Sequence, residues 1–137
     1  MYKAIETNKM KIEDSLQIAV CSYIRLQYPK VIFTSESSGV KLTMGQAVKA
    51  KKMRSSDKLP DLWIPFPMFP FFGLFIELKA QNPYNQKGKP KTKHIAAQLK
   101  VLERLMNLGY MTAMLYSFDS VKELIDRYMN LPEWEHK

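Results

Sequence analysis

The sequence predicts a single α/β domain in which a mixed β-sheet is flanked by helices. Apolar residues recur at three- and four-residue intervals in several segments, which is typical of amphipathic helices. Short runs of β-branched and aromatic residues lie between these segments and favour strands. Together they give the order α, β, (α), β, β, α, β, α, and this alternation predicts layers of helices around one sheet.

The length and composition fit one folded unit. The chain has 137 residues, of which 46% are hydrophobic, and a single core usually serves about 100–200 residues. We expect a flexible basic arm over residues 1–11, one domain over 12–130 and a tail over 131–137. The arm carries three lysines and little apolar content, so it has few side chains to bury.

The helices and strands can be predicted in chain order. A helix over residues 12–27 ends before Pro29, because proline cannot continue a helix. The β-branched and aromatic Val31–Thr34 is predicted to be a strand, and residues 35–39 a loop. The remaining elements follow the same two patterns: a helix over 43–53 capped by Thr43, strands over 62–64 and 73–79, a loop over 81–91, a helix over 92–107 capped by Thr92, a strand over 110–116 and a helix over 119–129.

The charge favours a polyanionic partner. The formal net charge is +8 and the isoelectric point is near 9.5, which is typical of proteins that bind nucleic acid and, less often, anionic membranes. No apolar run approaches the roughly 20 residues that cross a bilayer, and the N-terminus lacks the pattern of a secretory signal. A single cysteine, Cys21, excludes an internal disulfide framework. We therefore expect a cytoplasmic protein that does not bind membranes.

Two carboxylates and a lysine are predicted to meet at one edge of the sheet. Because side chains alternate along a strand, Glu77 and Lys79 share one face while Leu74 and Ile76 point to the other, buried face. Asp61 stands at the head of the preceding strand and can reach the same place. The sequence therefore predicts an acidic pair with a lysine beside it.

Such a cluster suits the hydrolysis of a phosphodiester. Mg²⁺ binds oxygen ligands, usually one or two carboxylates together with phosphate and water, and it activates water and offsets charge. We expect Asp61 and Glu77 to be metal ligands, with the backbone carbonyl of Leu78 as a third. Lys79 then holds or deprotonates the attacking water, or holds the phosphate as a point charge.

Two basic segments flank this cluster. We expect them to contact the DNA backbone, which would make affinity fall steeply with salt concentration. The alternative for the first segment is a solvated helix face without a partner. The predicted contacts are Lys49, Lys51, Lys52 and Arg54 before the cluster, and Lys87, Lys89, Lys91 and Lys93 after it.

A proline-rich apolar stretch, Pro65–Pro70, connects the two strands of the cluster. Proline has no backbone donor, so the stretch cannot extend the strand ladder and is predicted to be a hairpin connection. If its tip is exposed, it is an interaction surface; if it folds back, it is additional core. The sequence leaves both alternatives open.

These features resemble the PD-(D/E)xK nucleases, in particular the small stand-alone VRR-Nuc proteins of bacteria and phages. The resemblance covers residues 12–128, which is nearly the whole chain. The motifs that carry it are Glu13-Asp14-Ser15-Leu16-Gln17, the Ser37-Ser38-Gly39 loop, Pro60-Asp61-Leu62, the strand from Gly73 to Lys79, Gln98, and Leu105 with Leu108-Gly109-Tyr110.

The resemblance implies a restriction-endonuclease-like core, Mg²⁺ or Mn²⁺ as the metal, and DNA, often branched, as the substrate. It assigns the metal acids to Asp61 and Glu77, the catalytic lysine to Lys79, and the glutamine of the following helix to Gln98. The acid of the first helix falls on Glu13, which becomes a further candidate ligand. Stand-alone members are similar to Holliday-junction resolvases and tend to be homodimers, so the resemblance implies a bacterial or phage-encoded homodimer.

The chain departs from the family pattern at two places, and an alternative function remains. The family commonly has a shorter, glycine-containing lead into Pro60-Asp61, whereas this chain has Ser55-Ser56-Asp57-Lys58-Leu59. The loop over 81–91 is also longer and more basic, and both departures bear on the choice of substrate. The alternative is a non-catalytic nucleic-acid-binding module on the same fold, because binding alone would explain the net charge of +8.

Overall fold

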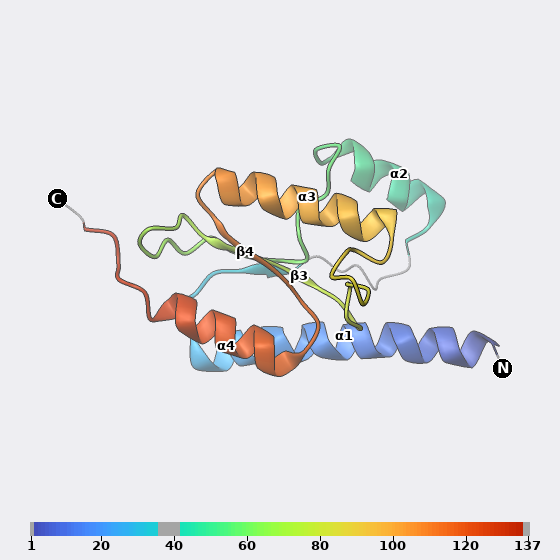
Figure 1. Ribbon diagram of the computed structural model, residues 1–137, viewed down its shortest axis with the longest axis horizontal. Helices are drawn as coiled ribbons and strands as arrows, with labels where there is room; N and C mark the ends of the chain where they lie inside the picture. Colours follow the sequence, from blue (N-terminus) through green and yellow to red (C-terminus); the bar gives the residue numbers. More distant parts are fainter. Residues whose placement is uncertain (1, 36–41, 136–137) are drawn as a thin grey trace.

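A central β-sheet is covered by helices on both faces (Figure 1). The computed structural model describes the backbone of residues 2–35 and 42–135, and the side chains in these ranges from residue 12 onward. The predicted fold class, a mixed sheet flanked by helices, is confirmed. The elements in chain order are α1 (Tyr2–Gln27), β1 (Thr34–Ser35), α2 (Met44–Lys52), β2 (Leu62–Ile64), β3 (Leu74–Leu78), α3 (Lys93–Asn107), β4 (Met111–Leu115) and α4 (Phe118–Met129).

The described strands lie in the order β1-β2-β3-β4. The pairs β1–β2 and β2–β3 are antiparallel, and β3–β4 is parallel. Parallel neighbours need a crossover connection, which α3 supplies between β3 and β4. In the hairpin of β2 and β3, Leu62 stands opposite Ile76 and Ile64 opposite Leu74. This register decides which side chains meet at the ends of the two strands.

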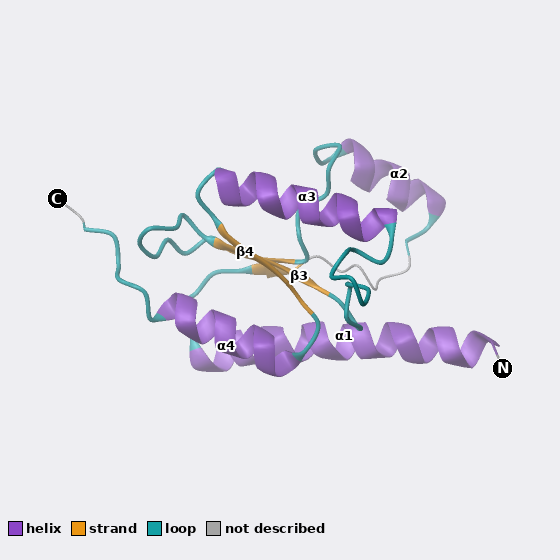
Figure 2. Cartoon of the chain, viewed as in Figure 1, coloured by secondary structure: helices purple, strands orange, loops and turns teal. Residues whose placement is uncertain are grey.

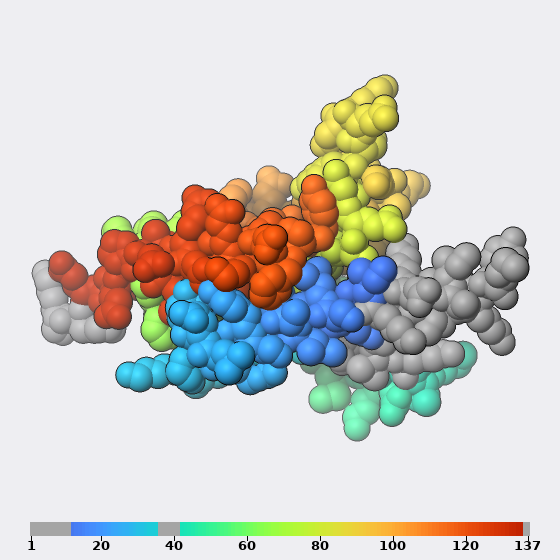
Figure 3. Space-filling view, turned by 90° about the horizontal axis from the view of Figure 1, so that it is seen from below, coloured from blue at the N-terminus to red at the C-terminus, as the bar shows by residue number. Residues whose placement is uncertain are grey.

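One face of the sheet packs on α1 and α4 and forms the hydrophobic core. The two helices lie side by side on this face (Figure 3), and α3 covers the opposite face (Figure 2). The alternation predicted for the strands holds, because the apolar positions of β2 and β3 are the ones that enter this core. The core residues are Val20 and Ile24 of α1, Leu62, Ile64, Leu74, Ile76 and Leu78 of the sheet, Met68 of the hairpin connection, and Val121, Ile125 and Tyr128 of α4.

The first helix is longer than predicted. It begins at Tyr2 rather than at residue 12, so the backbone of residues 2–11 is helical where we expected a loose arm. No proline or glycine precedes Pro29, and nothing local therefore stops the helix from extending toward the N-terminus. No helix in the described part of the chain is long and apolar enough to cross a membrane.

The first strand is shorter and later than predicted. We expected Val31–Thr34, but β1 is Thr34–Ser35, with Thr34 opposite Trp63. Val31 and Phe33 instead pack against the core without joining the ladder. Their apolar side chains are partly buried, and within the described residues the pairing of β1 with β2 covers Thr34 and Ser35.

The helix starts follow the capping residues. Thr43 and Thr92 each accept a hydrogen bond from a backbone amide of the first turn, as predicted. The last helix begins at Phe118, where we expected Asp119 or Ser120. Its cap is Ser117, whose side chain accepts a hydrogen bond from the Ser120 backbone amide. A serine just before the helix was the signal that the prediction missed.

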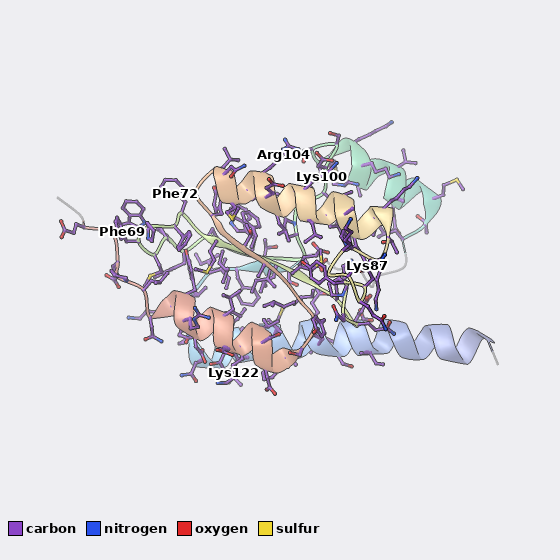
Figure 4. The ribbon with its side chains drawn as sticks, viewed as in Figure 1. Phe69, Phe72, Lys87, Lys100, Arg104 and Lys122 are labelled. Carbon is purple, nitrogen blue, oxygen red and sulfur yellow. The ribbon has the colours of Figure 1, made fainter. Side chains whose placement is uncertain are left out.

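The hairpin connection between β2 and β3 combines both predicted alternatives. Met68 is buried, and the Tyr128 hydroxyl donates a 2.6 Å hydrogen bond to the Phe66 carbonyl oxygen, so part of the tip belongs to the core. Phe69 and Phe72, in contrast, are 48% and 53% exposed. They lie together at one end of the molecule (Figure 4), where both rings contact Trp134.

Asp126 of α4 links this helix to α1. Its Oδ1 accepts hydrogen bonds from the hydroxyl groups of Tyr23 and Tyr28, the latter at 2.7 Å, and its Oδ2 accepts one from Lys122. These contacts, with that from Tyr23 foremost, hold the pKa of Asp126 below its ordinary value of 3.8. Tyr23 of α1 and Tyr28, which directly follows that helix, therefore stabilise one carboxylate of α4.

Replacing this carboxylate should weaken the contact between α1 and α4. Asp126→Asn is expected to lower the free energy of unfolding at pH 7 by about 1–2 kcal/mol, because two charge-assisted hydrogen bonds become neutral ones. The pKa of Asp126 is lowered on folding, so this stabilisation is present above pH 3.8 and is lost as the pH falls through the lowered value. Urea denaturation at several pH values measures the effect. Glu123→Gln, an exposed change on the same helix, is the control, and equal loss in both variants contradicts the prediction.

Candidate active site

The pairing of β2 with β3 brings two carboxylates together at one end of the sheet. Leu62 pairs with Ile76, so Asp61 and Glu77 are the next residues in the same register. They are 5% and 6% exposed, which is unusual for acidic residues. Asp61 Oδ2 accepts a 2.9 Å hydrogen bond from the backbone amide of Leu78. One oxygen of Asp61 is thus fixed by the strand.

Glu77 is held in a setting that disfavours its charge. Burial foremost, and then the nearby Asp61, raise the pKa of Glu77 from 4.5 to about 8. Gln98 of α3 donates a 2.9 Å hydrogen bond from Nε2 to Glu77 Oε1. This bond fixes the orientation of the Glu77 carboxyl group toward Asp61.

Lys79 follows β3 and is partly exposed at the same end of the sheet. Its backbone amide donates a 2.8 Å hydrogen bond to the carbonyl oxygen of Leu115, which extends the β3–β4 pairing by one residue. The positive charge of Lys79 acts against the two causes that raise the pKa of Glu77. An ammonium group therefore stands close to the acidic pair, as the strand alternation predicted.

These groups line one cavity of about 580 Å³. The cavity lies between the end of the sheet, the segment that precedes β2, and the first half of α3. The structure thus gathers in one place all five side chains that the sequence singled out for the site: Glu13, Asp61, Glu77, Lys79 and Gln98.

A search of the solved structures finds the same fold in a VRR_NUC domain protein. The two structures align with a TM-score of 0.66 over 90% of this chain and 92% of that chain, at 25% sequence identity. The chain therefore shares the fold of a VRR_NUC domain protein, which supports a nuclease-family domain. The predicted restriction-endonuclease-like fold class, a mixed sheet flanked by helices, is confirmed. No protein-family model matches the sequence, and a search of the curated proteins finds no match.

The candidate metal ligands at this site offer oxygen donors. In the described residues, no three histidine, cysteine or acidic side chains gather closely enough to hold a metal ion. Asp61 and Glu77 form the buried acidic pair, and Glu13 lines the same cavity. Gln98 Oε1 is buried and has no hydrogen-bond partner within the described part of the chain. Together with the backbone of Leu78, which also lines the cavity, this set suits a hard divalent cation.

The basic residues predicted to contact DNA lie on two sides of the cavity. Lys49, Lys51 and Lys52 are exposed on α2, a helix with no buried side chain, and Arg54 lines the cavity itself. The second group is exposed in the loop after β3 and at the start of α3 and comprises Lys87, Lys89, Lys91 and Lys93. This loop projects from the body of the molecule (Figure 3), and Lys87 lies at the end opposite Phe69 and Phe72 (Figure 4).

The cavity also includes residues that sequence reasoning missed. His94 of α3 is exposed and lines the cavity. Lys58 and Asp57, from the segment in which the chain departs from the family pattern, form part of the wall. Their proximity to Pro60-Asp61 in the sequence was the available signal. The Ser37–Gly39 loop, which carried part of the resemblance, lies outside the described residues.

The acidic pair should reduce the stability of the metal-free protein. Glu77→Gln is expected to raise the free energy of unfolding by about 1–2 kcal/mol, because it removes a buried carboxyl group beside Asp61 and keeps an oxygen for Gln98. Urea denaturation with a chelator at pH 8 measures this. Glu103→Gln, an exposed change on α3, should leave the stability unchanged. A loss of stability in Glu77→Gln contradicts the prediction.

Proposed function

We propose that this protein is a metal-dependent endodeoxyribonuclease of the VRR-Nuc type that cuts branched DNA. The observation that supports it best is the convergence of Asp61, Glu77 and Lys79 on one cavity, with both carboxylates buried. Buried acids without a cation are costly, so their presence favours a function over a purely structural role.

Asp61 and Glu77 would hold Mg²⁺ or Mn²⁺, together with the backbone carbonyl of Leu78 and with Glu13 as a further candidate ligand. When bound, the ion orients the attacking water, lowers its pKa and offsets charge on the phosphate. The hydrogen bond from the Leu78 amide, which holds Asp61 Oδ2 in a fixed position at the cavity, supports this role.

Lys79 is proposed to act on the attacking water or on the phosphate. As an ammonium group it holds the scissile phosphate by charge, and with its proton released it accepts a proton from the water. Gln98 positions Glu77 by donating to its Oε1. The role of Gln98 is thus one of positioning, and that of Lys79 is catalytic.

The flanking lysines and Arg54 are proposed to bind the DNA backbone on both sides of the cleavage site. The formal charge of +8 supports a polyanionic substrate, and the lysines on α2 and in the 81–91 loop are exposed. Contacts from two directions suit DNA whose strands diverge at a junction. This part of the proposal extends the family resemblance to substrate choice.

Cleavage assays test the reaction. Purified protein is incubated with a labelled four-way junction, a flap and a linear duplex in Mg²⁺ or Mn²⁺, and the junction is expected to be cut fastest. Lys79→Ala should lower the cleavage rate by about 10²–10³-fold because it removes a charge from the transition state. A chelator should abolish cleavage in all samples.

Lys30→Ala is the matched control, because Lys30 is exposed in the turn after α1 and does not line the cavity. If no DNA is cut in either metal, or if Lys79→Ala cuts as fast as the parent, the proposed reaction is wrong. Salt-sensitive DNA binding without cleavage would favour the non-catalytic binding module.

We further propose that the protein is a homodimer, which would present two active sites to two strands of a junction. The exposed Phe69 and Phe72 at the hairpin tip support an apolar contact between copies. Light scattering at micromolar concentration should give a mass near twice 16.0 kDa, and Phe69→Ser should shift it toward the monomer. A mass of 16.0 kDa for the parent protein contradicts the dimer.

A further inference from the structure

The segment between α2 and β2 forms one wall of the active-site cavity. It follows Met53, the C-cap of α2, and ends at the buried Pro60 that precedes Asp61. Its cavity-lining residues are Arg54, Ser56, Asp57, Lys58 and Leu59. The motif acid Asp61 therefore shares its cavity with the residues that immediately precede it in the chain.

Hydrogen bonds within the segment fix its shape. The Arg54 side chain donates from Nη1 to the carbonyl oxygens of Ser55 and Ser56, at 3.0 and 3.3 Å. The Ser55 hydroxyl donates to the carbonyl oxygen of Asp57. Three consecutive backbone carbonyls are thus bonded by side chains of the segment itself, and the backbone next to Lys58 is held in one turn.

An ion pair ties the segment to α3. Arg104 Nη1 lies 2.6 Å from Asp57 Oδ2, and these two residues are 47 positions apart in the sequence. Figure 4 shows Arg104 on α3, the helix that also carries Gln98. Both side chains are largely exposed, so the pair adds little stability, but it fixes where the segment lies against the helix. Lys58 follows Asp57 directly, so its position depends on this contact.

Lys58 lines the same cavity as the acidic pair. It is exposed overall and lines the cavity together with Asp61, Glu77 and Lys79. Burial and Asp61 raise the pKa of Glu77, and the charge of Lys58, like that of Lys79, acts in the opposite direction. The cavity therefore contains two ammonium groups that reach the carboxylates from different elements, Lys79 from the end of β3 and Lys58 from the wall before β2.

The charge balance of the site explains why a second lysine would favour the reaction. Two carboxylates carry −2 and a divalent cation carries +2, so this set is neutral by itself. A phosphodiester enters with one negative charge. Attack by hydroxide, or by a water molecule that gives up a proton to a base as it attacks, adds a second as the phosphorane-like transition state forms. Lys79 offsets one of these charges. A cation beside it on the same cavity offsets the other.

We propose that Lys58 is a second active-site lysine that binds a non-bridging oxygen of the scissile phosphate. The assignment rests on the nuclease function proposed above and adds to it a residue outside the motif that carries the family resemblance. Asp57 and Arg104 are positioning residues, since their ion pair holds the segment against α3. Lys58 binds the phosphate oxygen by charge, and no proton is transferred to or from it in this role.

Lys58→Ala tests the proposal, with Lys58→Arg as the conservative variant and Lys30→Ala as the control. Because Lys58 is exposed, thermal unfolding of the variants should match that of the parent. Two functional readouts are measured: the single-turnover cleavage rate of a labelled junction in Mg²⁺ at saturating protein, and the affinity for the same junction in a chelator over a range of salt concentrations.

Lys58→Ala should lower the single-turnover rate about tenfold or more, and Lys58→Arg should recover much of it. In the chelator, the slope of log affinity against log salt should fall by about one for Lys58→Ala, as expected for the loss of one phosphate contact. Lys30→Ala should change neither readout.

If Lys58→Ala cleaves the junction at the parent's single-turnover rate at saturating protein, the active-site role is wrong, even if the variant binds the junction more weakly. An unchanged salt slope overturns the phosphate contact. If the parent cuts no DNA in Mg²⁺ or Mn²⁺, the proposed nuclease function fails, and the salt slope alone then decides whether Lys58 binds phosphate. The two failures are therefore distinguishable.

Discussion

The antiparallel pairing of β2 with β3 is the constraint on which the site depends. The register that places Leu62 opposite Ile76 also places Asp61 beside Glu77, and the same pairing lets the Leu78 amide bind Asp61. A shift by one residue would turn every side chain of a strand to the other face, which would expose the apolar core positions. The burial of those positions against α1 and α4 therefore fixes the geometry of the carboxylates.

Much of this arrangement could be predicted from the sequence because the signals are local. Two-residue alternation identified the faces of β3, and the capping threonines marked the starts of α2 and α3. The first strand was misplaced because Val31 and Phe33 have strand-like side chains that pack on the core without pairing. Which residues of an edge strand join the ladder depends on the partner strand, which local propensity does not describe.

The rest required contacts between distant parts of the chain. The hairpin tip is divided between core and surface because Tyr128 binds the Phe66 carbonyl while Trp134 packs on Phe69 and Phe72. Similarly, the contact of Asp57 with Arg104 spans 47 positions, and no spacing in the sequence predicts it. Sequence motifs located the carboxylates and Lys79, but the residues that complete the cavity walls became visible with the tertiary structure.

The two faces of the sheet also bear on how such a protein can change over evolutionary time. On the α3 side, Trp63 stacks on Phe75 with ring centres 5.4 Å apart, next to the carboxylates, whereas the opposite face is purely an aliphatic and aromatic core. Such a core tolerates many volume-conserving replacements. Most of its amino acids can therefore be replaced during evolution while the backbone fold is kept. This explains how 25% identity and the lack of a matching family model coexist with a TM-score of 0.66. New substrate preferences can arise in the cavity walls without rebuilding the scaffold.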